Sequence, residues 1–218
     1  MTLSAFVQLP GDNLVLASAS STRAKILHDA GLGYRCYPVG IDEASVRASA
    51  SAEGVPVGDI AIMLAEMKAA AAVQRLALEI ASAPAYVLGC DQILSCDEVI
   101  YSKPRDHAMA KSQLMALSGK THQLSSAAVL YRHGERIWHH LAIAKITMRH
   151  FDEGFIDSYL DRLGEAAFSS PASYQIENLG AQLLSQIDGC HFAILGLPLL
   201  ELLSILREHG LRAGENRQ

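Results

Sequence analysis

The chain has 218 residues, of which half are hydrophobic and 19% are charged, and its formal net charge is −5. This composition supplies a sizeable core, and it excludes both a disordered chain and a protein that a global basic field recruits to nucleic acid. The four cysteines form no CxxC pair and the nine histidines show no HxxxH or HExxH spacing. The sequence therefore indicates neither a zinc site nor a disulfide framework.

Strands and helices alternate in the first half of the chain. The first apolar run breaks into a Ser/Thr-rich turn before a helix that Gly31 ends. Small residues such as Ser49, Ser51 and Gly54 predict a loop before a long helix. The predicted elements of this half are a strand at 13–17, a helix at 23–30, a strand at 34–39, an Ala-rich helix at 60–80 and a buried strand at 86–94.

The second half combines a hairpin with further helices. His133 and Gly134 separate two long runs, as is typical of an antiparallel hairpin. Asp152 is a predicted N-cap, and Pro198 stands where proline favours a helix start. The predicted elements are an extended piece that ends at Tyr101, a helix at 107–117, hairpin strands at 121–131 and 136–149, a helix at 152–163, strands at 183–187 and 191–194, and a helix from 198 to about 209.

This order of elements predicts an α/β protein with a mixed sheet. The length fits one domain or two lobes that share a core. We expect a single domain over 1–218, with its core at about 13–209 and a polar tail at 212–218. Because the first residues lack a signal-peptide pattern and the apolar stretches are too short to span a bilayer, we expect a soluble, cytoplasmic protein with no membrane partner.

Asp91 interrupts the most apolar of the predicted strands. Burying a carboxylate costs several kcal/mol unless a cation or a metal compensates. A strand-borne Asp therefore either hydrogen-bonds a neighbouring loop or is held for chemistry. On its own, the residue leaves both interpretations open.

The turn after the first strand concentrates hydroxyls and a cation. Ser18, Ser20, Ser21, Thr22 and Arg23 stand together at a predicted helix start, where free backbone N–H groups bind anions. Ordinary helix capping by Ser or Thr is the alternative. The turn is not a Walker loop, because its glycines and the Lys-Ser/Thr ending are missing.

An ordered set of short motifs runs along the chain and resembles the Maf family of nucleoside triphosphate pyrophosphatases from about Leu14 to Leu206. Each piece is weak alone, but the pieces occur in the family's order and spacing. They are the Leu-Ala-Ser turn at 16–23, Asp42-Glu43, Lys68, Gly89-Cys90-Asp91, Lys103-Pro104, the Leu-Ser-Gly-x-x-His segment at 117–122, and Gly196-Leu197-Pro198.

The resemblance implies a curved mixed sheet flanked by helices, with two lobes around a central cleft. It also implies a house-cleaning hydrolase of acid anhydrides that cleaves between the α and β phosphates of a nucleotide. In that scheme Asp91 accepts a proton from the attacking water, and Glu43 and Asp91 hold Mg²⁺ or Mn²⁺. The residues expected to neutralise the triphosphate are Ser18, Ser20, Arg23, Lys68 and Lys103.

Three departures from the family's usual residues matter. Thr22 replaces an Arg, Gln92 replaces a Thr, and the segment 169–177 has Ser170 in place of a Lys and Glu177 in place of a Gln. Gln92 and Glu177 resemble the branch that acts on 7-methyl-GTP more than the branch that acts on dTTP and UTP. A carboxylate can accept from the N1–H and amine of guanine, whereas uracil and thymine offer one N–H between two carbonyl acceptors. We therefore expect Thr22, Gln92 and Glu177 to contact substrate, with a guanine-type base favoured; plain polar lining is the alternative.

The sequence leaves one other function open. The alternative is a nucleotide-binding regulator of septum formation and cell division with weak or no catalysis, a role also associated with the family. A pure binder needs cations but no proton acceptor at Asp91, so the acidic residues favour the enzyme. No basic stripe with interleaved aromatics supports a nucleic-acid partner. The resemblance makes a homodimer an expectation.

Overall fold

A computed structural model describes residues 14–79 and 86–209 of the chain. The predicted polar tail at 212–218 and position 13 of the first predicted strand lie outside these residues. None of the helices in these two ranges has the length and apolar character that crossing a membrane requires.

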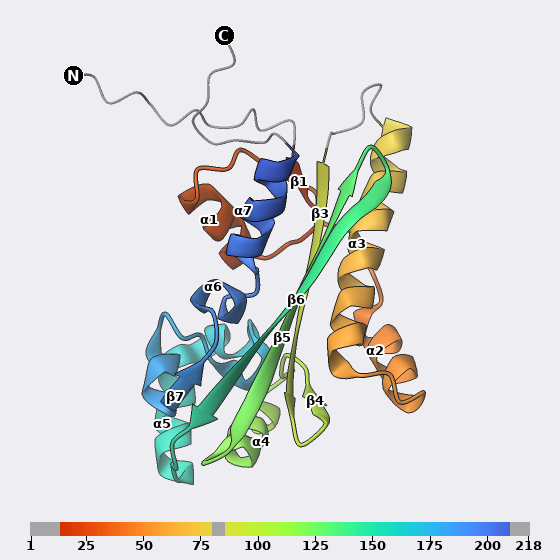
Figure 1. Cartoon of the computed structure of the whole chain (residues 1–218). Coiled ribbons are helices and arrows are strands. Elements are labelled where there is room, and N and C mark those ends of the chain that lie inside the picture. The colour runs from red at the N-terminus through yellow and green to blue at the C-terminus, as the bar shows by residue number, and fades with distance from the viewer. Residues whose placement is uncertain (1–13, 80–85, 210–218) are drawn as a thin grey trace, which may run out of the picture. The chain divides into compact units, whose positions relative to one another are not determined.

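The protein is α/β, with a seven-stranded mixed sheet and helices on its flanks, as the sequence predicts (Figure 1). The strand order is β2-β1-β3-β5-β6-β7, and β4 pairs with β3. β1 runs parallel to β2 and β3, whereas the β3–β4 and β6–β7 pairs are antiparallel. The strands are β1 (Leu14–Leu16), β2 (Arg35–Cys36), β3 (Tyr86–Cys96), β4 (Val99–Tyr101), β5 (Thr121–Arg132), β6 (Glu135–Met148) and β7 (Leu184–Asp188).

Most helices begin at a side-chain cap. Ser20, Asp42, Asp106 and Asp152 each accept a hydrogen bond from the backbone N–H three residues later. The helices are α1 (Ser21–Asp29), α2 (Glu43–Ala52), α3 (Val57–Glu79), α4 (His107–Leu117), α5 (Glu153–Leu163), α6 (His191–Ile194) and α7 (Leu199–Glu208), with 3-10 turns η1 (Gly164–Phe168), η2 (Pro171–Ser173) and η3 (Leu179–Leu183).

Several predicted elements differ from the observed ones. The segment around Ser49 and Ser51 is the helix α2 and not a loop, because Asp42 caps it and Ala50 is buried. The stretch 191–194 is the short helix α6 and not a strand. The second predicted strand shrinks to Arg35–Cys36. The hairpin and the helix at 107–117 are confirmed.

The chain divides into two compact units. Among the described residues, unit 1 consists of 14–79, 86–92, 126–142 and 191–209, and unit 2 consists of 93–125 and 143–190. In unit 2, α4 packs against α5. β3, β5 and β6 each begin or end in unit 1 and continue along the chain into unit 2.

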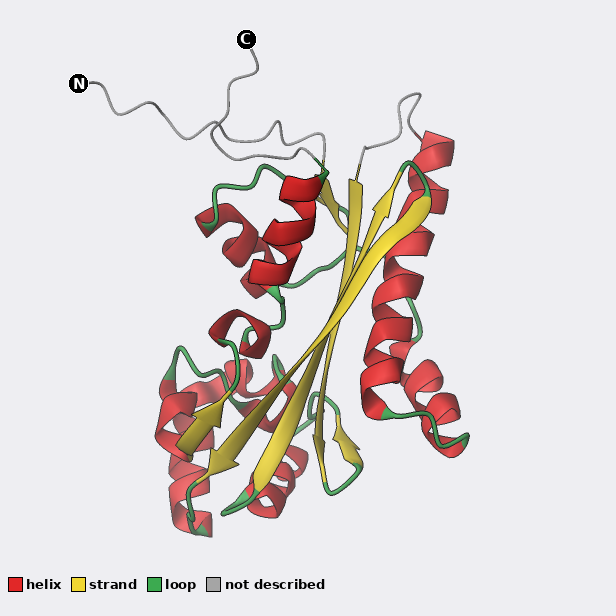
Figure 2. Cartoon of the chain, viewed as in Figure 1, coloured by secondary structure: helices red, strands yellow, loops and turns green. Residues whose placement is uncertain are grey.

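In unit 1, successive residues of β1 face two different helix layers. Leu14 and Leu16 pack in one cluster with residues of α1 and α7, whereas Val15 packs with the buried face of α3. Figure 2 shows α1 and α7 on one side of these strands and α3 on the other. Both faces of β1 and of the start of β3 are therefore buried, which explains their continuous apolar sequence.

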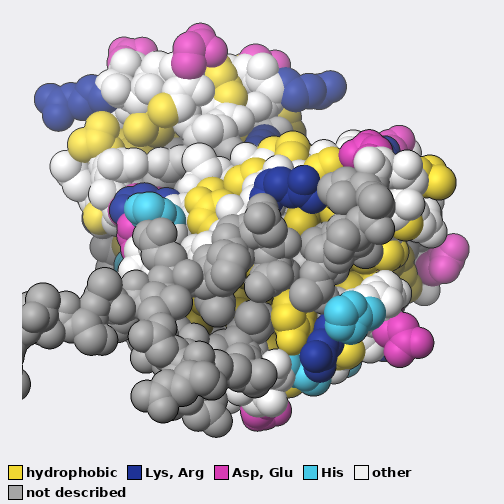
Figure 3. Space-filling view, turned by 90° about the horizontal axis from the view of Figure 1, so that it is seen from above, with side chains coloured by type: hydrophobic (Ala, Val, Ile, Leu, Met, Phe, Trp, Pro, Cys, Tyr) yellow, Lys and Arg dark blue, Asp and Glu magenta, His cyan; other side chains and the backbone are white. Residues whose placement is uncertain are grey.

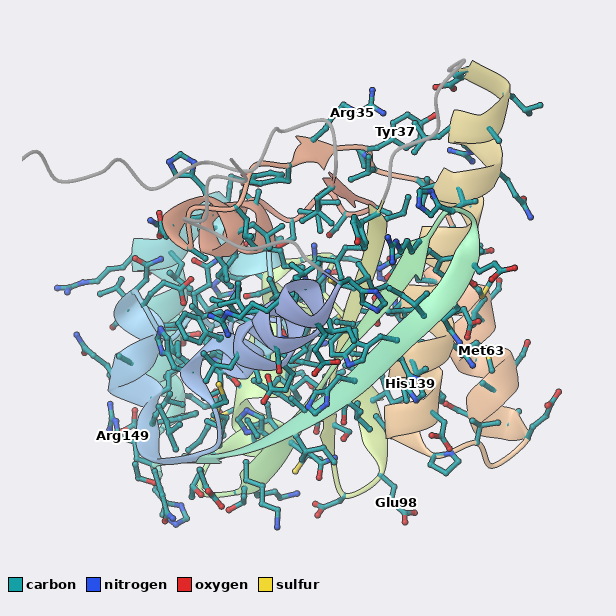
Figure 4. All side chains as sticks on the ribbon, turned by 45° about the horizontal axis from the view of Figure 1, so that its top comes forward. Arg35, Tyr37, Met63, Glu98, His139 and Arg149 are labelled. Atoms are coloured by element: carbon teal, nitrogen blue, oxygen red, sulfur yellow. The ribbon has the colours of Figure 1, made fainter. Side chains whose placement is uncertain are left out.

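The far end of α3 is tied to the edge of the sheet in unit 1. Arg35 and Tyr37 belong to the segment around β2 (Figure 4), and the Tyr37 hydroxyl donates to Glu79 Oε1 at 2.8 Å. Glu79 is the last residue of α3. The long helix that carries Lys68 is thus attached to the sheet at this end by a side-chain contact as well as by apolar packing.

Candidate active site

Asp91 lies in the middle of β3 and is only 3% exposed. Its Oδ1 accepts a hydrogen bond from Lys68 Nζ at 2.6 Å, and its Oδ2 has no hydrogen-bond partner. Burial raises the pKa of Asp91 above its ordinary value, although Lys68 and Arg23 oppose that shift. A buried carboxylate with one unpaired oxygen and a raised pKa is well suited to accept a proton.

Lys68 joins Asp91 to a second carboxylate. Its side chain projects from α3, and the residue is 8% exposed. Nζ lies 2.6 Å from Asp91 Oδ1 and 2.7 Å from Glu43 Oε1. The ammonium group therefore neutralises part of the charge of both carboxylates and keeps Glu43 and Asp91 next to each other.

Gly89 allows α3 to approach β3 closely enough for this contact. A Cβ at that position would lie 2.0 Å from the carbonyl oxygen of Ala65 and 2.9 Å from the Cβ of Ala69. Both residues flank Lys68 on α3. The Gly-x-Asp pattern of the sequence thus has a physical reason: the glycine admits the helix, and the helix delivers the lysine to the aspartate.

Glu43 is the first residue of α2 and is partly exposed. Its second oxygen, Oε2, lies 3.1 Å from Arg47 Nη1. Burial alone would raise the pKa of Glu43, but Lys68 and Arg47 together hold it below its ordinary value. Glu43 is therefore ionised at neutral pH and offers hard oxygen atoms at the edge of the site. Sequence reasoning missed Arg47, whose i,i+4 spacing from Glu43 becomes informative only once this segment is known to be a helix.

The Ser18–Arg23 turn is a capped helix start that is packed around its arginine. Ser20 Oγ caps α1 by accepting from the Arg23 N–H at 3.3 Å, and Ser18 Oγ accepts from the Ser20 N–H at 3.2 Å. Arg23 is buried and donates to Ser18 Oγ and to the carbonyl oxygens of Cys90 and Gly196. Helix capping, the alternative left open by the sequence, is therefore present.

The carbonyl oxygen of Cys90 links this turn to the acidic residues. It accepts from Arg23 Nη1 at 3.0 Å and from Lys68 Nζ at 3.5 Å. Two buried cations thus lie beside the backbone that carries Asp91. The Cys90 thiol is fully buried, and burial raises its pKa to about 11. This cysteine is a core residue and not a nucleophile.

Gln92 and Thr22 have different surroundings in unit 1. The Gln92 amide nitrogen donates to Ser126 Oγ at 2.8 Å and to the carbonyl oxygens of Ala193 and Ile194 at 3.0 and 2.9 Å. This places the amide nitrogen inside unit 1 and ties β3 to α6. Thr22 is half-buried in the first turn of α1, beside the capping serines.

Lys103 and Glu177 belong to unit 2. Lys103 is exposed in the loop between β4 and α4, and Glu177 is exposed in the turn between η2 and η3. Ser170, which stands where the family's usual lysine would be, donates its hydroxyl to the Tyr174 carbonyl oxygen at 3.0 Å. The structure thus brings Ser18, Ser20, Arg23, Glu43, Lys68 and Asp91 together within unit 1, and the cleft that would add Lys103 and Glu177 stays a prediction.

The predicted metal ligands are adjacent, but they do not form a preassembled metal cage. The described residues contain no group of three or more His, Cys, Asp or Glu side chains that could hold an ion. Glu43 and Asp91 do supply carboxylate oxygens, the donors that Mg²⁺ and Mn²⁺ prefer, and Asp91 Oδ2 is unpaired. Two carboxylates fit a cation that is also held by phosphate oxygens of its substrate.

The exposed Lys and Arg side chains are scattered on the face shown in Figure 3. On the face shown in Figure 3, the Lys and Arg side chains of the described residues stand apart from one another, with apolar and acidic side chains between them. They form no single basic patch on that face. Within the candidate site, the cations beside Asp91 are the buried Arg23 and Lys68.

Comparisons with known proteins point to one family. The family described as "Maf-like protein" matches residues 13–209. A nucleoside triphosphate pyrophosphatase of Paramagnetospirillum magneticum is 45% identical over 196 residues, which cover 90% of this chain and 98% of that protein. A 7-methyl-GTP pyrophosphatase of Brucella suis is 46% identical over 194 residues, or 89% of this chain and 94% of that protein. A nucleoside triphosphate pyrophosphatase of Rhodospirillum rubrum is 45% identical over 198 residues, with 91% and 95% covered.

Proposed function

Because this chain belongs to the Maf-like protein family, we propose that it is a nucleoside triphosphate pyrophosphatase that releases a nucleoside monophosphate and pyrophosphate. The observation that carries the proposal is the state of Asp91. It is buried, bonded to Lys68 through one oxygen, and unpaired at the other. A module that only binds nucleotides needs cations and gains nothing from an unpaired buried carboxylate, which is costly to keep.

In the proposed reaction, Asp91 Oδ2 accepts the proton of a water molecule that attacks the α phosphorus. The bond from that phosphorus to the bridging oxygen breaks, and pyrophosphate leaves. Lys68 orients Asp91 through Oδ1, so that the other oxygen stays available. Arg23 and Ser18, together with the start of α1, supply positive charge and N–H donors for the phosphates.

A divalent cation fits the proposed site only together with the substrate. Glu43 and Asp91 would hold it, with the remaining ligands from phosphate oxygens and water, because the described residues provide no third acidic or imidazole ligand. When bound, Mg²⁺ or Mn²⁺ would neutralise negative charge on the triphosphate. We accordingly expect the free enzyme to bind Mn²⁺ weakly, and to bind it tightly in the presence of an α,β-methylene nucleotide. Isothermal titration with and without the analogue measures the difference, and equally tight binding in both cases would contradict the expectation.

We further propose a guanine-type substrate, with 7-methyl-GTP preferred over dTTP and UTP. Several relatives carry the name 7-methyl-GTP pyrophosphatase, and they are 42–46% identical to this chain. The exposed Glu177 can accept from the N1–H and the amine of guanine. Uracil and thymine offer a single N–H between two carbonyl oxygens, so Glu177 would lose one hydrogen bond relative to guanine, a difference of about 1–3 kcal/mol.

The test is product analysis on a panel of dTTP, UTP, CTP, GTP and 7-methyl-GTP with Mg²⁺ or Mn²⁺. Pyrophosphate and the monophosphate, without inorganic phosphate, are the expected products. The substitution Glu177→Gln is expected to lower kcat/KM for the guanine nucleotides by roughly 5- to 150-fold, as the loss of about 1–3 kcal/mol implies. No turnover of any nucleotide, with binding intact, would instead favour the nucleotide-binding regulator.

A further inference from the structure

Unit 2 contains a buried amide that contacts both segments expected to reach the nucleotide. Gln113 on α4 is 8% exposed. Its Nε2 donates to the carbonyl oxygen of Ser102 at 3.0 Å, and its Oε1 accepts from the backbone N–H of Ala172 at 3.1 Å. Ser102 directly precedes Lys103 in the chain. One side chain therefore ties the loop of Lys103 to the segment that leads to Glu177.

The second of these segments has a backbone that needs outside support. Within 169–180, Ala172 and Ser173 both have φ of 54°, a left-handed conformation that residues with a Cβ rarely adopt. Such strain persists only where the surroundings determine it. The Tyr159 hydroxyl donates to the Ser173 carbonyl oxygen at 2.9 Å. The segment also borders an open pocket of about 500 Å³.

A buried histidine–tyrosine pair fixes the same segment nearer to Glu177. His122 on β5 is 2% exposed, and its Nε2 lies 2.6 Å from the Tyr174 hydroxyl, with the two rings edge to face. Burial lowers the pKa of His122 to about 4, so the ring is neutral at physiological pH. Tyr174 stands three residues before Glu177. The contact with His122 therefore holds Tyr174 in place, and Tyr174 leads directly into the turn that carries Glu177.

We propose that Gln113 and His122 are positioning residues for the nucleotide: Gln113 acts through Ser102 on Lys103, and His122 acts through Tyr174 on Glu177. This inference rests on the proposed function, in which Lys103 contacts the phosphates and Glu177 contacts the base. The two contacts are expected to affect different kinetic properties, whereas a general loss of stability would affect both. Disturbing the Gln113–Ser102 contact weakens binding of every nucleotide alike, whereas disturbing the His122–Tyr174 contact changes the preference among bases.

Two substitutions test the two arms. Gln113→Glu keeps an acceptor for the Ala172 N–H but sets a carboxylate against the Ser102 carbonyl oxygen. We expect KM for all nucleotides to rise roughly 10- to 100-fold, as for a misplaced contact group. This rise should be absent when Lys103→Ala is already present, because the two changes then act on one contact. Gln186→Glu, which introduces the same charge on the exposed strand β7, is the matched control and should change nothing.

Tyr174→Phe removes one hydroxyl and keeps the ring. We expect the ratio of kcat/KM between GTP and dTTP to move toward one, and this change should vanish in a Glu177→Ala background. Additive effects in both double-mutant cycles, or unchanged kinetics with only a lower melting temperature, would overturn the proposal and leave a purely structural network.

Hydrogen exchange of the ligand-free protein separates failure of this inference from failure of the proposed function. Gln113→Glu is expected to speed amide exchange at 102–106, and Tyr174→Phe is expected to speed it at 174–178. Unchanged exchange at these segments would overturn the positioning role even if the wild-type chain turns over nucleotides. If the wild type hydrolyses no nucleotide, the proposed function fails, and the exchange data alone decide whether the side chains hold the two segments.

Discussion

Lys68 is the only cation that contacts both carboxylates of the candidate site in the described part of unit 1. An ammonium group so close to two acids offsets the cost of burying them, and each acid in turn offsets the cost of burying the ammonium. Removing one member therefore leaves a charge that the remaining residues cannot compensate. Arg23 cannot replace it, because its guanidinium is bonded to Ser18 and to two backbone carbonyls.

We predict that Lys68→Met lowers the free energy of unfolding by about 3–5 kcal/mol, because it leaves Asp91 buried and unpaired. Lys25→Met is the matched control, since Lys25 forms an exposed ion pair with Asp29 and its loss should cost at most about 1 kcal/mol. Urea denaturation of both variants measures the difference. Equal losses would show that the Lys68 contacts contribute no more than a surface pair.

At the scale of single residues, the sequence identifies the charged groups but not their backbone partners. Asp91 is conspicuous as an acid in an apolar strand. Lys68 is recognised as a candidate only by its place in the ordered set of motifs. The carbonyl oxygen of Cys90, which brings Arg23 and Lys68 together, leaves no trace in the sequence, because every residue has a carbonyl. The amide of Gln92 likewise could not be assigned to α6 before that helix was known.

At the scale of elements, the approach of α3 to β3 decides whether the site exists. We predict that Gly89→Ala displaces α3, because the added Cβ would overlap the Ala65 carbonyl oxygen. The substitution should destabilise the fold by about 1–3 kcal/mol and reduce pyrophosphate release by moving Lys68 away from Asp91. Gly40→Ala, where a Cβ meets nothing within 4 Å, is the control. Thermal melting with a pyrophosphate assay checks both effects, and wild-type activity in Gly89→Ala would refute the packing argument.

The elements that the sequence predicts well are those with local signals. The helix at 107–117 and the hairpin around His133 have a capping aspartate or a turn glycine, and both match the structure. The sequence does not predict α2, because its Ser- and Ala-rich residues show no clear apolar stripe and its packing against α3 decides its conformation. The sequence predicts a strand where α6 forms, because a segment of four residues is too short to show a distinguishing period.

At the scale of the whole molecule, the buried His122 makes stability depend on pH. Its pKa is about 4 in the folded chain against an ordinary 6.5, so between these values the unfolded chain binds more protons. Stability is therefore full above pH 6.5 and falls as the pH drops toward 4, by up to about 1.4 kcal/mol per pH unit.

We predict that His122→Gln reduces this dependence between pH 6.5 and 4.5, because the variant lacks the imidazole that protonates there on unfolding. The raised pKa of Asp91 contributes to the slope in both proteins and therefore cancels in the comparison. The carboxyls of Asp42 and Glu43, whose pKa values are lowered, titrate below this window. Urea unfolding of the wild type and the variant across the pH range gives the two slopes. Identical slopes would contradict a buried neutral histidine.

The class of the whole fold follows from the sequence because alternating strands and helices favour a mixed sheet with helical flanks. The strand order β2-β1-β3-β5-β6-β7 does not follow in the same way. Which strands become neighbours depends on contacts between residues far apart in the chain, such as the pairing of Leu14–Leu16 with Tyr86–Leu88. The division of the sheet strands between two compact units is likewise visible only in three dimensions.

The most direct test of the account is pyrophosphate release by the wild type and by Asp91→Asn, with Asp29→Asn as an exposed control. The amide keeps the shape of Asp91 but cannot accept the proton, so turnover should fall by roughly 10²–10⁴-fold. The melting temperature is expected to fall, because Lys68 loses one of its two carboxylate partners, so turnover is compared at a temperature at which both proteins are folded. Asp29→Asn should behave as the wild type. Undiminished pyrophosphate release by a folded Asp91→Asn protein would contradict the role of Asp91 as the proton acceptor.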